Sequence, residues 1–223
     1  MKDLLSPIEV ETANNPRYAV IWLHGLGADG ADFPPIVPEL GLAAQPGVRF
    51  IFPHAPHIPV TCNGGYVMRA WYDIISLAPD SRQVDENGIV ASRATVRDLI
   101  ARENRRGIPC ARIFLAGFSQ GGAIALTTAL THDEPLAGVI ALSTYLPAPT
   151  LVTRELSAAN RALPVFAAHG SHDDVVAPTL GRQARDFLVT HGYAVDWHEY
   201  PMPHSVCLEE IAALGQWLRA RLP

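Results

Sequence analysis

The fold is decided by residues 112–130, which read RIFLAGFSQGGAIALTTAL. The apolar start of this stretch is typical of a buried strand, and the small apolar residues at its end are typical of a buried helix. Between them lies a Gly-x-Ser-x-Gly pentapeptide centred on Ser119, which in this setting indicates a nucleophile elbow. In such an elbow a sharp strand-to-helix turn exposes the serine hydroxyl, and the flanking glycines leave room for the turn.

The pentapeptide alone is moderate evidence, because chance supplies it in about one chain in fifteen of this length. The alternative is a glycine-rich turn whose serine only caps the following helix. The rest of the chain decides between the two interpretations, since a serine hydrolase also needs an acid, a base and an oxyanion hole.

Candidates for the acid and the base follow the serine in the chain order of an α/β-hydrolase. The octapeptide HGSHDDVV comes directly after a predicted strand and offers Asp173 or Asp174 as the acid. His204 comes after the last predicted strand and is the candidate base. His169 and His172 compete only weakly for the role of base, because they precede the acid in the chain.

The oxyanion hole should consist of two backbone N–H groups. One belongs to the residue after the nucleophile, which is Gln120, and the other comes from a loop after an early strand. The sequence HGLG at 24–27 follows such a strand, and Leu26 would be its donor. The alternative is a plain glycine-rich turn at this position.

Short apolar runs alternate with helical patterns along the chain. The predicted strands are 18–23, 48–52, 112–116, 138–142, 164–168 and 194–200. The predicted helices are 33–40, 88–106, 121–131, 179–191 and 205–221. Most of the middle strands are apolar throughout, as parallel strands covered on both faces are. We therefore expect one α/β-hydrolase domain over 1–223, in three layers, with a mostly parallel central sheet and helices on both faces.

Residues of about 54–86 interrupt this alternation with an apolar stretch in which no helix is evident. The stretch is too apolar for disorder. It is either an irregular extension that completes the core or a lid over the active site. We expect an irregular, lid-like insertion here.

Composition argues against several other classes of protein. The net charge of −5 disfavours nucleic acid as a partner, because nucleic-acid binding normally needs a basic patch. Cys62, Cys110 and Cys207 are far apart and form no CxxC spacing, which argues against a zinc site or a disulfide framework. The first seven residues contain no apolar signal region, and no membrane span is evident. We expect a cytoplasmic protein without stable membrane insertion.

Five stretches of this chain resemble the phospholipase/carboxylesterase family, which includes bacterial carboxylesterases and acyl-protein thioesterases. They are WLHGLG at 22–27, WYD at 71–73, GFSQGG at 117–122, HGSHDDVV at 169–176 and MPHS at 202–205. The resemblance spans nearly the whole chain. It implies that Ser119 is the nucleophile, that His204 is the base and that Asp173, rather than Asp174, is the acid.

The resemblance also implies that Leu26 and Gln120 provide the oxyanion-hole donors. The segment around Trp71 would line or cover an apolar acyl groove. The candidate groove residues are Trp71, Tyr72, Met68 and Ile75. One departure from the family pattern is Pro203, because a proline next to the base restricts the loop that carries it.

The predicted activity is hydrolysis of carboxylic esters, or of acyl thioesters including acyl-proteins, through an acyl-enzyme. No metal and no cofactor is needed for this chemistry. The expected partners are a small ester or acyl substrate, or an acylated protein, and the family also contains homodimers. The alternatives are a peptidase or amidase on the same scaffold and a non-catalytic protein that binds an acyl ligand.

Overall fold

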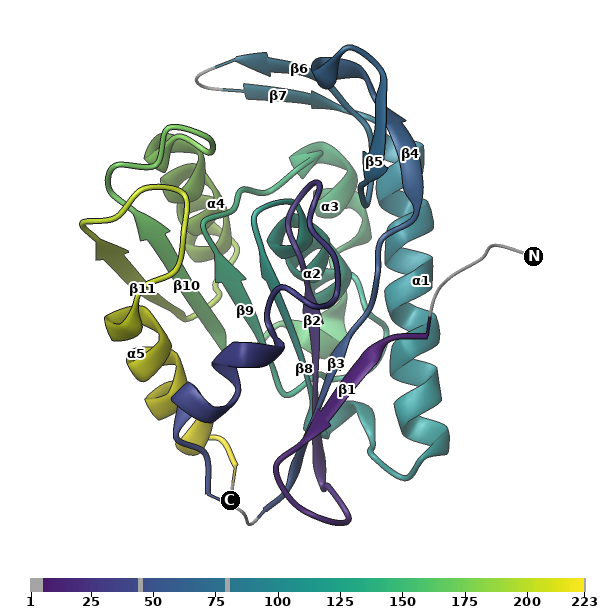
Figure 1. The fold of residues 1–223 in the computed structure, drawn as a ribbon, viewed down its shortest axis with the longest axis vertical. Coiled ribbons are helices and arrows are strands. Elements are labelled where there is room, and N and C mark those ends of the chain that lie inside the picture. The colour runs from purple at the N-terminus through teal and green to yellow at the C-terminus, as the bar shows by residue number, and fades with distance from the viewer. Residues whose placement is uncertain (1–5, 44–45, 79–80, 223) are drawn as a thin grey trace.

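A seven-stranded sheet runs through the computed structural model, which describes residues 6–43, 46–78 and 81–222 (Figure 1). The strand order is β1-β3-β2-β8-β9-β10-β11. The strands are β1 (Ile8–Glu11), β2 (Tyr18–Leu23), β3 (Val48–Phe52), β8 (Ile113–Phe118), β9 (Gly138–Leu142), β10 (Val165–Gly170) and β11 (Val195–Tyr200). β1 pairs antiparallel with β3, and the other neighbours pair in parallel. The mostly parallel sheet that the sequence predicts is confirmed.

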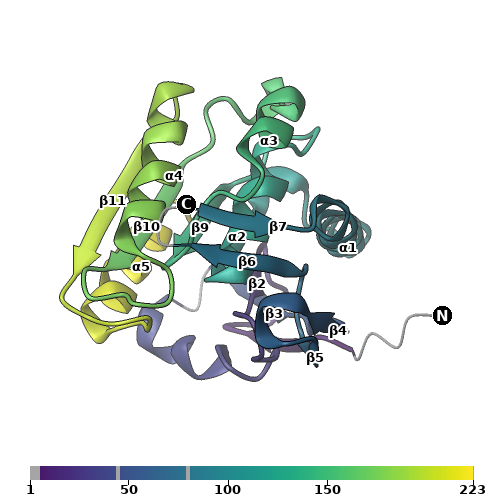
Figure 2. The same ribbon diagram turned by 90° about the horizontal axis from the view of Figure 1, so that it is seen from above.

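Helices cover both faces of this sheet, as the view from above shows (Figure 2). One face carries α1 (Glu86–Arg105), α2 (Gln120–Leu130), α3 (Pro149–Glu155) and α4 (Pro178–Thr190). The other face carries α5 (Leu208–Arg219) and two short 3₁₀ turns, η1 (Pro34–Ile36) and η2 (Pro38–Leu40). The three-layer α/β architecture is therefore also confirmed.

Strand β2 shows why the sheet is buried on both sides. All of its residues are buried, and successive side chains of a strand point to opposite faces. Ile21 and Leu23 pack into the core beneath α1 and α2. Val20 and Trp22 pack into the core beneath α5. Burial from both sides explains the apolar run without alternation that marks this strand in the sequence.

The clearest difference between predicted and observed helices lies at 33–40. The structure has η1 and η2 there, and each begins with a proline. The proline that begins η2 has no N–H to continue a helix and restricts the residue before it. The sequence patterns also predict neither α3 nor β1. β1 is short and alternates half-buried with exposed side chains at the edge of the sheet.

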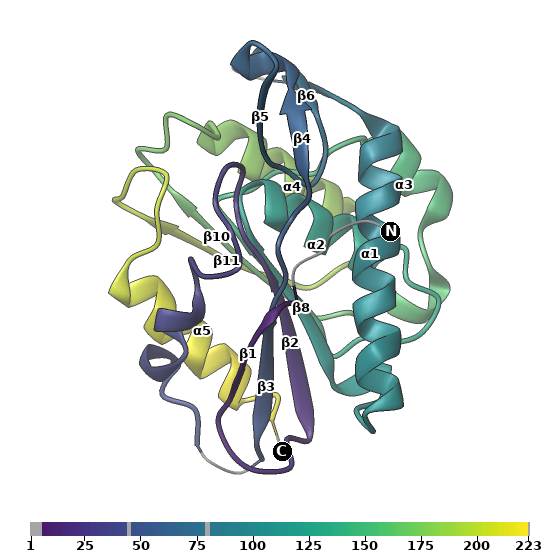
Figure 3. The ribbon, with the colours of Figure 1, turned by 45° about the vertical axis from the view of Figure 1, so that its right-hand side comes forward.

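The stretch 54–86 is more regular than the irregular insertion that we expect. It forms two antiparallel hairpins, β4 (His57–Val60) with β5 (Tyr66–Arg69) and β6 (Ile74–Ala78) with β7 (Ser81–Val84). Residues 79–80 lie outside the described residues. The first hairpin turns at Gly64 and Gly65, whose positive φ angles of 67° and 77° favour glycine. Both hairpins lie beyond the carboxyl end of the sheet (Figure 1, Figure 3).

Within the part of the chain that the structure describes, no helix is long and apolar enough to cross a membrane. The expectation about the N-terminus rests in part on residues 1–5, which lie outside the described residues. The cytoplasmic location stays a prediction.

Candidate active site

Ser119 stands at the turn between β8 and α2 with φ 54° and ψ −122°. A serine rarely adopts a positive φ, and such a conformation costs roughly 1–3 kcal/mol. Neighbouring hydrogen bonds hold it in place. The Ser119 amide donates to the Leu142 carbonyl over 2.9 Å, and the Thr144 hydroxyl donates to the Ser119 carbonyl over 2.6 Å. This geometry is that of a nucleophile elbow.

The flanking glycines are required by close packing of the backbone. A Cβ atom on Gly117 would lie 2.4 Å from the carbonyl carbon of Gly121. A Cβ atom on Gly121 would lie 2.3 Å from the Leu23 carbonyl oxygen. Both distances are shorter than any real contact of a side chain, so only glycine fits at either position. This is the physical reason for the Gly-x-Ser-x-Gly pattern in this chain.

Asp173 and His204 form a hydrogen-bonded pair beside this turn. His204 Nδ1 donates to Asp173 Oδ2 over 2.7 Å. The other carboxylate oxygen, Oδ1, accepts the Val175 and Val176 amides over 2.9 and 2.8 Å. Burial would raise the pKa of Asp173, but hydrogen bonds from His169, His204 and the Val176 amide outweigh it and lower this pKa well below its usual range. The carboxylate is therefore ionised where it meets the imidazole.

The His204 ring also packs on the elbow itself. Its centroid lies 4.6 Å from that of Phe118, the residue before Ser119. The loop after β10, which carries Asp173 (the acid loop), is joined to the loop after β11, which carries His204 (the base loop). The His172 amide donates to the Met202 carbonyl over 3.1 Å. Ser119, Asp173 and His204 thus follow three strands that end at the same edge of the sheet.

Asp174 does not share this environment. Its side chain is exposed, whereas Asp173 is only 4% exposed. The geometry therefore favours Asp173 between the two candidate acids. Pro203 belongs to the tightly packed base loop, because a Cβ on Gly170 would lie 2.4 Å from the Pro203 carbonyl oxygen.

His169 contacts the candidate acid Asp173, which the motif order does not predict. Its Nε2 atom lies 2.8 Å from the Val176 carbonyl oxygen and 3.3 Å from Asp173 Oδ2. The ring fits because residue 181 is glycine, where a Cβ would lie 2.3 Å from His169 Nδ1. The spacing of four residues between His169 and Asp173 is the signal from which this contact could have been suspected.

The HGLG loop at 24–27 lies against the elbow, since a Cβ on Gly25 would be 3.5 Å from the Ser119 Cβ. His24 fixes this loop. Its Nδ1 donates to the Gly25 carbonyl over 2.7 Å, and its Nε2 accepts the Ala55 amide over 3.0 Å. Burial lowers the pKa of His24 to about 4, so the ring is neutral near pH 7. Within the described residues, the Leu26 and Gln120 amides donate to no protein acceptor.

The Gln120 side chain has a second role that the sequence does not reveal. Its Oε1 atom accepts the Trp71 amide over 2.8 Å, and its Nε2 donates to the Tyr72 carbonyl over 2.7 Å. The Trp71 indole N–H in turn donates to the His24 carbonyl over 2.9 Å. These bonds attach the segment between the two hairpins to the elbow and to the HGLG loop.

A pocket of about 260 Å³ opens beside Ser119 and Gln120. Its apolar wall consists of Leu26, Ile74, Leu77, Tyr145, Val175 and Val176. Leu26 is thus both a candidate oxyanion donor and part of the pocket wall. A small apolar pocket at a serine elbow suits the acyl part of an ester.

None of the four expected groove residues is among the described residues that line this pocket. Trp71 and Tyr72 are buried in the core. Met68 lies on the other hairpin, where its sulfur accepts from the Asn63 amide group. Ile75 is 40% exposed, whereas its neighbour Ile74 is buried and lines the pocket. A shift of one residue in a strand turns a side chain to the opposite face.

One cluster within the described residues has the donor types for a metal ion. Ligand atoms of Cys110, His132 and Glu134 lie within 4.8 Å of one another. A ligating histidine normally donates its second ring N–H to a neighbour. His132 Nδ1 is buried and has no hydrogen-bond partner among the described residues. The cluster lacks this support, and it belongs to the opposite end of β8 from Ser119.

Fold and elbow together define a serine hydrolase of the α/β-hydrolase class. Residues 7–222 match the family model described as Phospholipase/Carboxylesterase. The chain therefore belongs to the phospholipase/carboxylesterase family.

Named relatives agree with this family. The chain is 42% identical to acyl-protein thioesterase 1 of Neurospora crassa, over 97% of this chain and 92% of that protein. It is 36% identical to a probable carboxylesterase of Oryza sativa, over 97% of this chain and 82% of that protein. Its fold is similar to the crystal structure of Arabidopsis thaliana SOBER1, with a TM-score of 0.87 and 31% identity. That match covers 93% of this chain and all of the SOBER1 chain.

Proposed function

We propose that the protein hydrolyses carboxylic esters with Ser119 as nucleophile, His204 as general base and Asp173 as the acid of the triad. The observation that carries this proposal is the 2.7 Å bond from His204 Nδ1 to a buried Asp173 carboxylate, next to a serine held at positive φ. A serine that only caps a helix does not need a hydrogen-bonded histidine and aspartate beside it.

The reaction follows from these positions. As the Ser119 Oγ attacks the carbonyl carbon, His204 Nε2 takes the hydroxyl proton and the carbonyl π electrons move to the oxygen. The Leu26 and Gln120 amides and the positive end of α2 stabilise this oxyanion. The tetrahedral intermediate then collapses, and the leaving alkoxide or thiolate takes the proton from His204. Water attacks the acyl-enzyme by the same route and releases the acid.

The ionised Asp173 keeps the proton of His204 on Nδ1, so that Nε2 is free to accept the proton of Ser119. It also stabilises the imidazolium that forms in the transition state. Asp173 does not have to take up a proton, because its pKa is held far below that of an imidazole.

The substrate class follows from the pocket and from the relatives. The apolar wall beside Ser119 suits an acyl chain, and several relatives bear the name acyl-protein thioesterase. We propose acyl esters and acyl thioesters as substrates, including those of acylated proteins. A cytoplasmic location and a homodimer stay predictions from the sequence and from the family resemblance.

The test is hydrolysis of p-nitrophenyl esters by the wild type and by Ser119→Ala. The variant should lose several orders of magnitude in kcat while it stays folded, because the triad acts as a unit. Ser171→Ala is the matched control, since Ser171 is exposed and lies in the acid loop. Near-normal activity of Ser119→Ala would exclude the assignment. Faster hydrolysis of p-nitroanilides than of esters would indicate a peptidase.

A further inference from the structure

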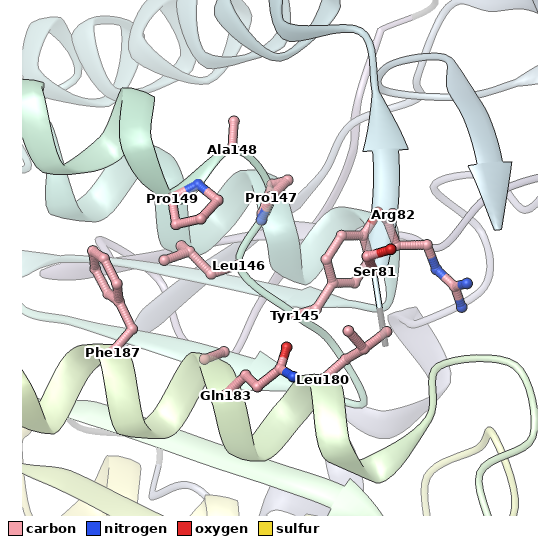
Figure 4. Close-up of a pocket in the computed structure, with 11 residues that line it drawn as sticks. Ser81, Arg82, Tyr145, Leu146, Pro147, Ala148, Pro149, Leu180, Gln183 and Phe187 are labelled. Carbon is pink, nitrogen blue, oxygen red and sulfur yellow. The ribbon is translucent and has the colours of Figure 1, made fainter. Parts of the chain in front are cut away.

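A second cavity, of about 330 Å³, lies beyond the pocket that adjoins Ser119. Figure 4 shows it between the chain segment 145–149 and α4. Leu146 and Pro149 form one side of this cavity, and Leu180 and Phe187 on α4 form the other. The catalytic mechanism described above uses none of these four side chains.

Tyr145 lines both this cavity and the pocket beside Ser119. It is 5% exposed, and its hydroxyl lies 2.7 Å from that of the fully buried Tyr72. Burial raises the pKa of Tyr145 to about 12, so both hydroxyls can share a hydrogen bond without charge. The phenol ring is therefore held in place where the two spaces adjoin.

Among the described residues, Arg82 also lines both spaces. It comes from β7 and donates to the Val175 carbonyl. A long charged side chain at a half-buried position adapts more readily than a buried aromatic ring. Tyr145 is therefore the fixed part of the boundary.

The size of the first pocket indicates how long an acyl chain it can hold. A methylene group needs about as much space as a water molecule, which is on the order of 30 Å³. The pocket of about 260 Å³ then takes roughly eight or nine carbon atoms. The second cavity has room for at least as many.

We propose that Tyr145 determines the acyl-chain specificity of this enzyme, by closing the acyl pocket at medium chain length and separating it from the second cavity. The inference rests on the proposed ester hydrolysis at Ser119. Removal of the ring joins the two cavities and lets a longer chain extend between Leu146 and α4.

The experiment is a series of p-nitrophenyl esters from acetate to palmitate, read as kcat/KM for each chain length. In the wild type, kcat/KM should rise to about eight carbons and fall beyond ten. Tyr145→Phe keeps the ring and should keep this order of chain lengths. Tyr145→Ala should raise the ratio of palmitate to octanoate rates at least tenfold, since each further buried methylene is worth about fourfold.

Ala184 provides the matched control, because it lies on α4 and lines the second cavity but not the first. Ala184→Phe in the Tyr145→Ala background should cancel the gain for palmitate. Ala184→Phe alone should leave the wild-type series unchanged. Ala184→Phe alone tests the proposal even if Tyr145→Ala does not fold. If long acyl chains already reach the second cavity in the wild type, the phenylalanine at 184 would block them and long-chain activity would fall.

Three results would overturn the proposal. They are equal wild-type rates for palmitate and octanoate, an unchanged chain-length order in folded Tyr145→Ala, and a loss of long-chain activity in Ala184→Phe alone. A wild type that hydrolyses none of the esters, acetate included, would instead refute the proposed function itself.

Discussion

Replacement of Asp173 by asparagine tests the triad with a change of one atom. The carboxylate uses its two oxygens for different partners. Oδ1 accepts the Val175 and Val176 amides, and Oδ2 accepts from His204 Nδ1. An asparagine can keep its oxygen on the two backbone amides, which leaves its NH₂ group facing His204. Because NH₂ cannot accept the Nδ1 proton, the imidazole is held with its proton on Nε2 and cannot accept one from Ser119.

The expected loss in kcat is large because the imidazole of the variant has the wrong tautomer and is not merely held less firmly. The equivalent change in a Ser-His-Asp triad costs about 10⁴ in kcat. At about 1.4 kcal/mol for each factor of ten, this corresponds to about 5 kcal/mol of transition-state stabilisation. KM should change little, since Asp173 is not among the described residues that line the pocket.

The assay is steady-state hydrolysis of p-nitrophenyl butyrate, with circular dichroism to show that the variant is folded. Asp174→Asn is the matched control, because Asp174 is the next residue and is exposed. It should keep kcat within about twofold, as surface changes usually do. If Asp173→Asn keeps a tenth of the wild-type kcat, or if Asp174→Asn loses more than Asp173→Asn does, Asp173 is not the acid of the triad.

Three other predictions concern residues around the site and in the core. Gln120→Ala keeps the backbone donor but removes the side-chain hydrogen bonds to Trp71 and Tyr72. Hydrogen exchange at 71–72 should therefore accelerate, and kcat should fall about tenfold. Unchanged exchange would contradict the role of the Gln120 side chain in holding this segment. Burial raises the pKa of Glu210 from 4.5 to about 8, so the buried carboxyl group destabilises the folded protein increasingly as the pH rises between these values. Glu210→Gln should therefore stabilise the protein by on the order of 4 kcal/mol more at pH 8.5 than at pH 5, as measured by urea unfolding. Burial lowers the pKa of His24 to about 4, so roughly 3 kcal/mol of stability should be lost as the pH falls from 6.5 to 4. In His24→Asn, the free energy of unfolding should depend less on pH over this range.

The sheet and the elbow could be predicted because local sequence determines them. β2, β3 and β9 have the predicted bounds, since an apolar run buried on both faces has clear ends. The elbow is equally local, because a side chain at Gly121 would collide with the Leu23 carbonyl. Chain order alone indicated the acid and base loops that meet beside Ser119.

The pocket could not be predicted in the same way, because it depends on contacts between distant segments. Whether Ile74 or Ile75 faces the pocket is decided by the register of β6, which a bulge with β7 disturbs. The bond between Tyr72 and Tyr145 joins residues that are 73 positions apart. Nothing in the local pattern around either tyrosine indicates this contact.

The contact between His169 and Asp173 is local in sequence, and chain order hides it for a different reason. As a candidate base it stands before the acid in the chain, which is the wrong order. In the fold its Nε2 lies 3.3 Å from Asp173 Oδ2, so its contact is with the acid rather than with the serine. Motif order identifies the groups that react, but it does not identify those that support them.

The most direct test of the central claim is labelling by a fluorophosphonate, followed by mass spectrometry of the digested protein. A triad-activated serine should take up one phosphonyl group, and the modified peptide should carry it on Ser119. Ser119→Ala should remain unlabelled, and Asp173→Asn should be labelled far more slowly than the wild type. Ester hydrolysis by a wild type that is not labelled, or that is labelled at another residue, would contradict the assignment of Ser119 as the nucleophile.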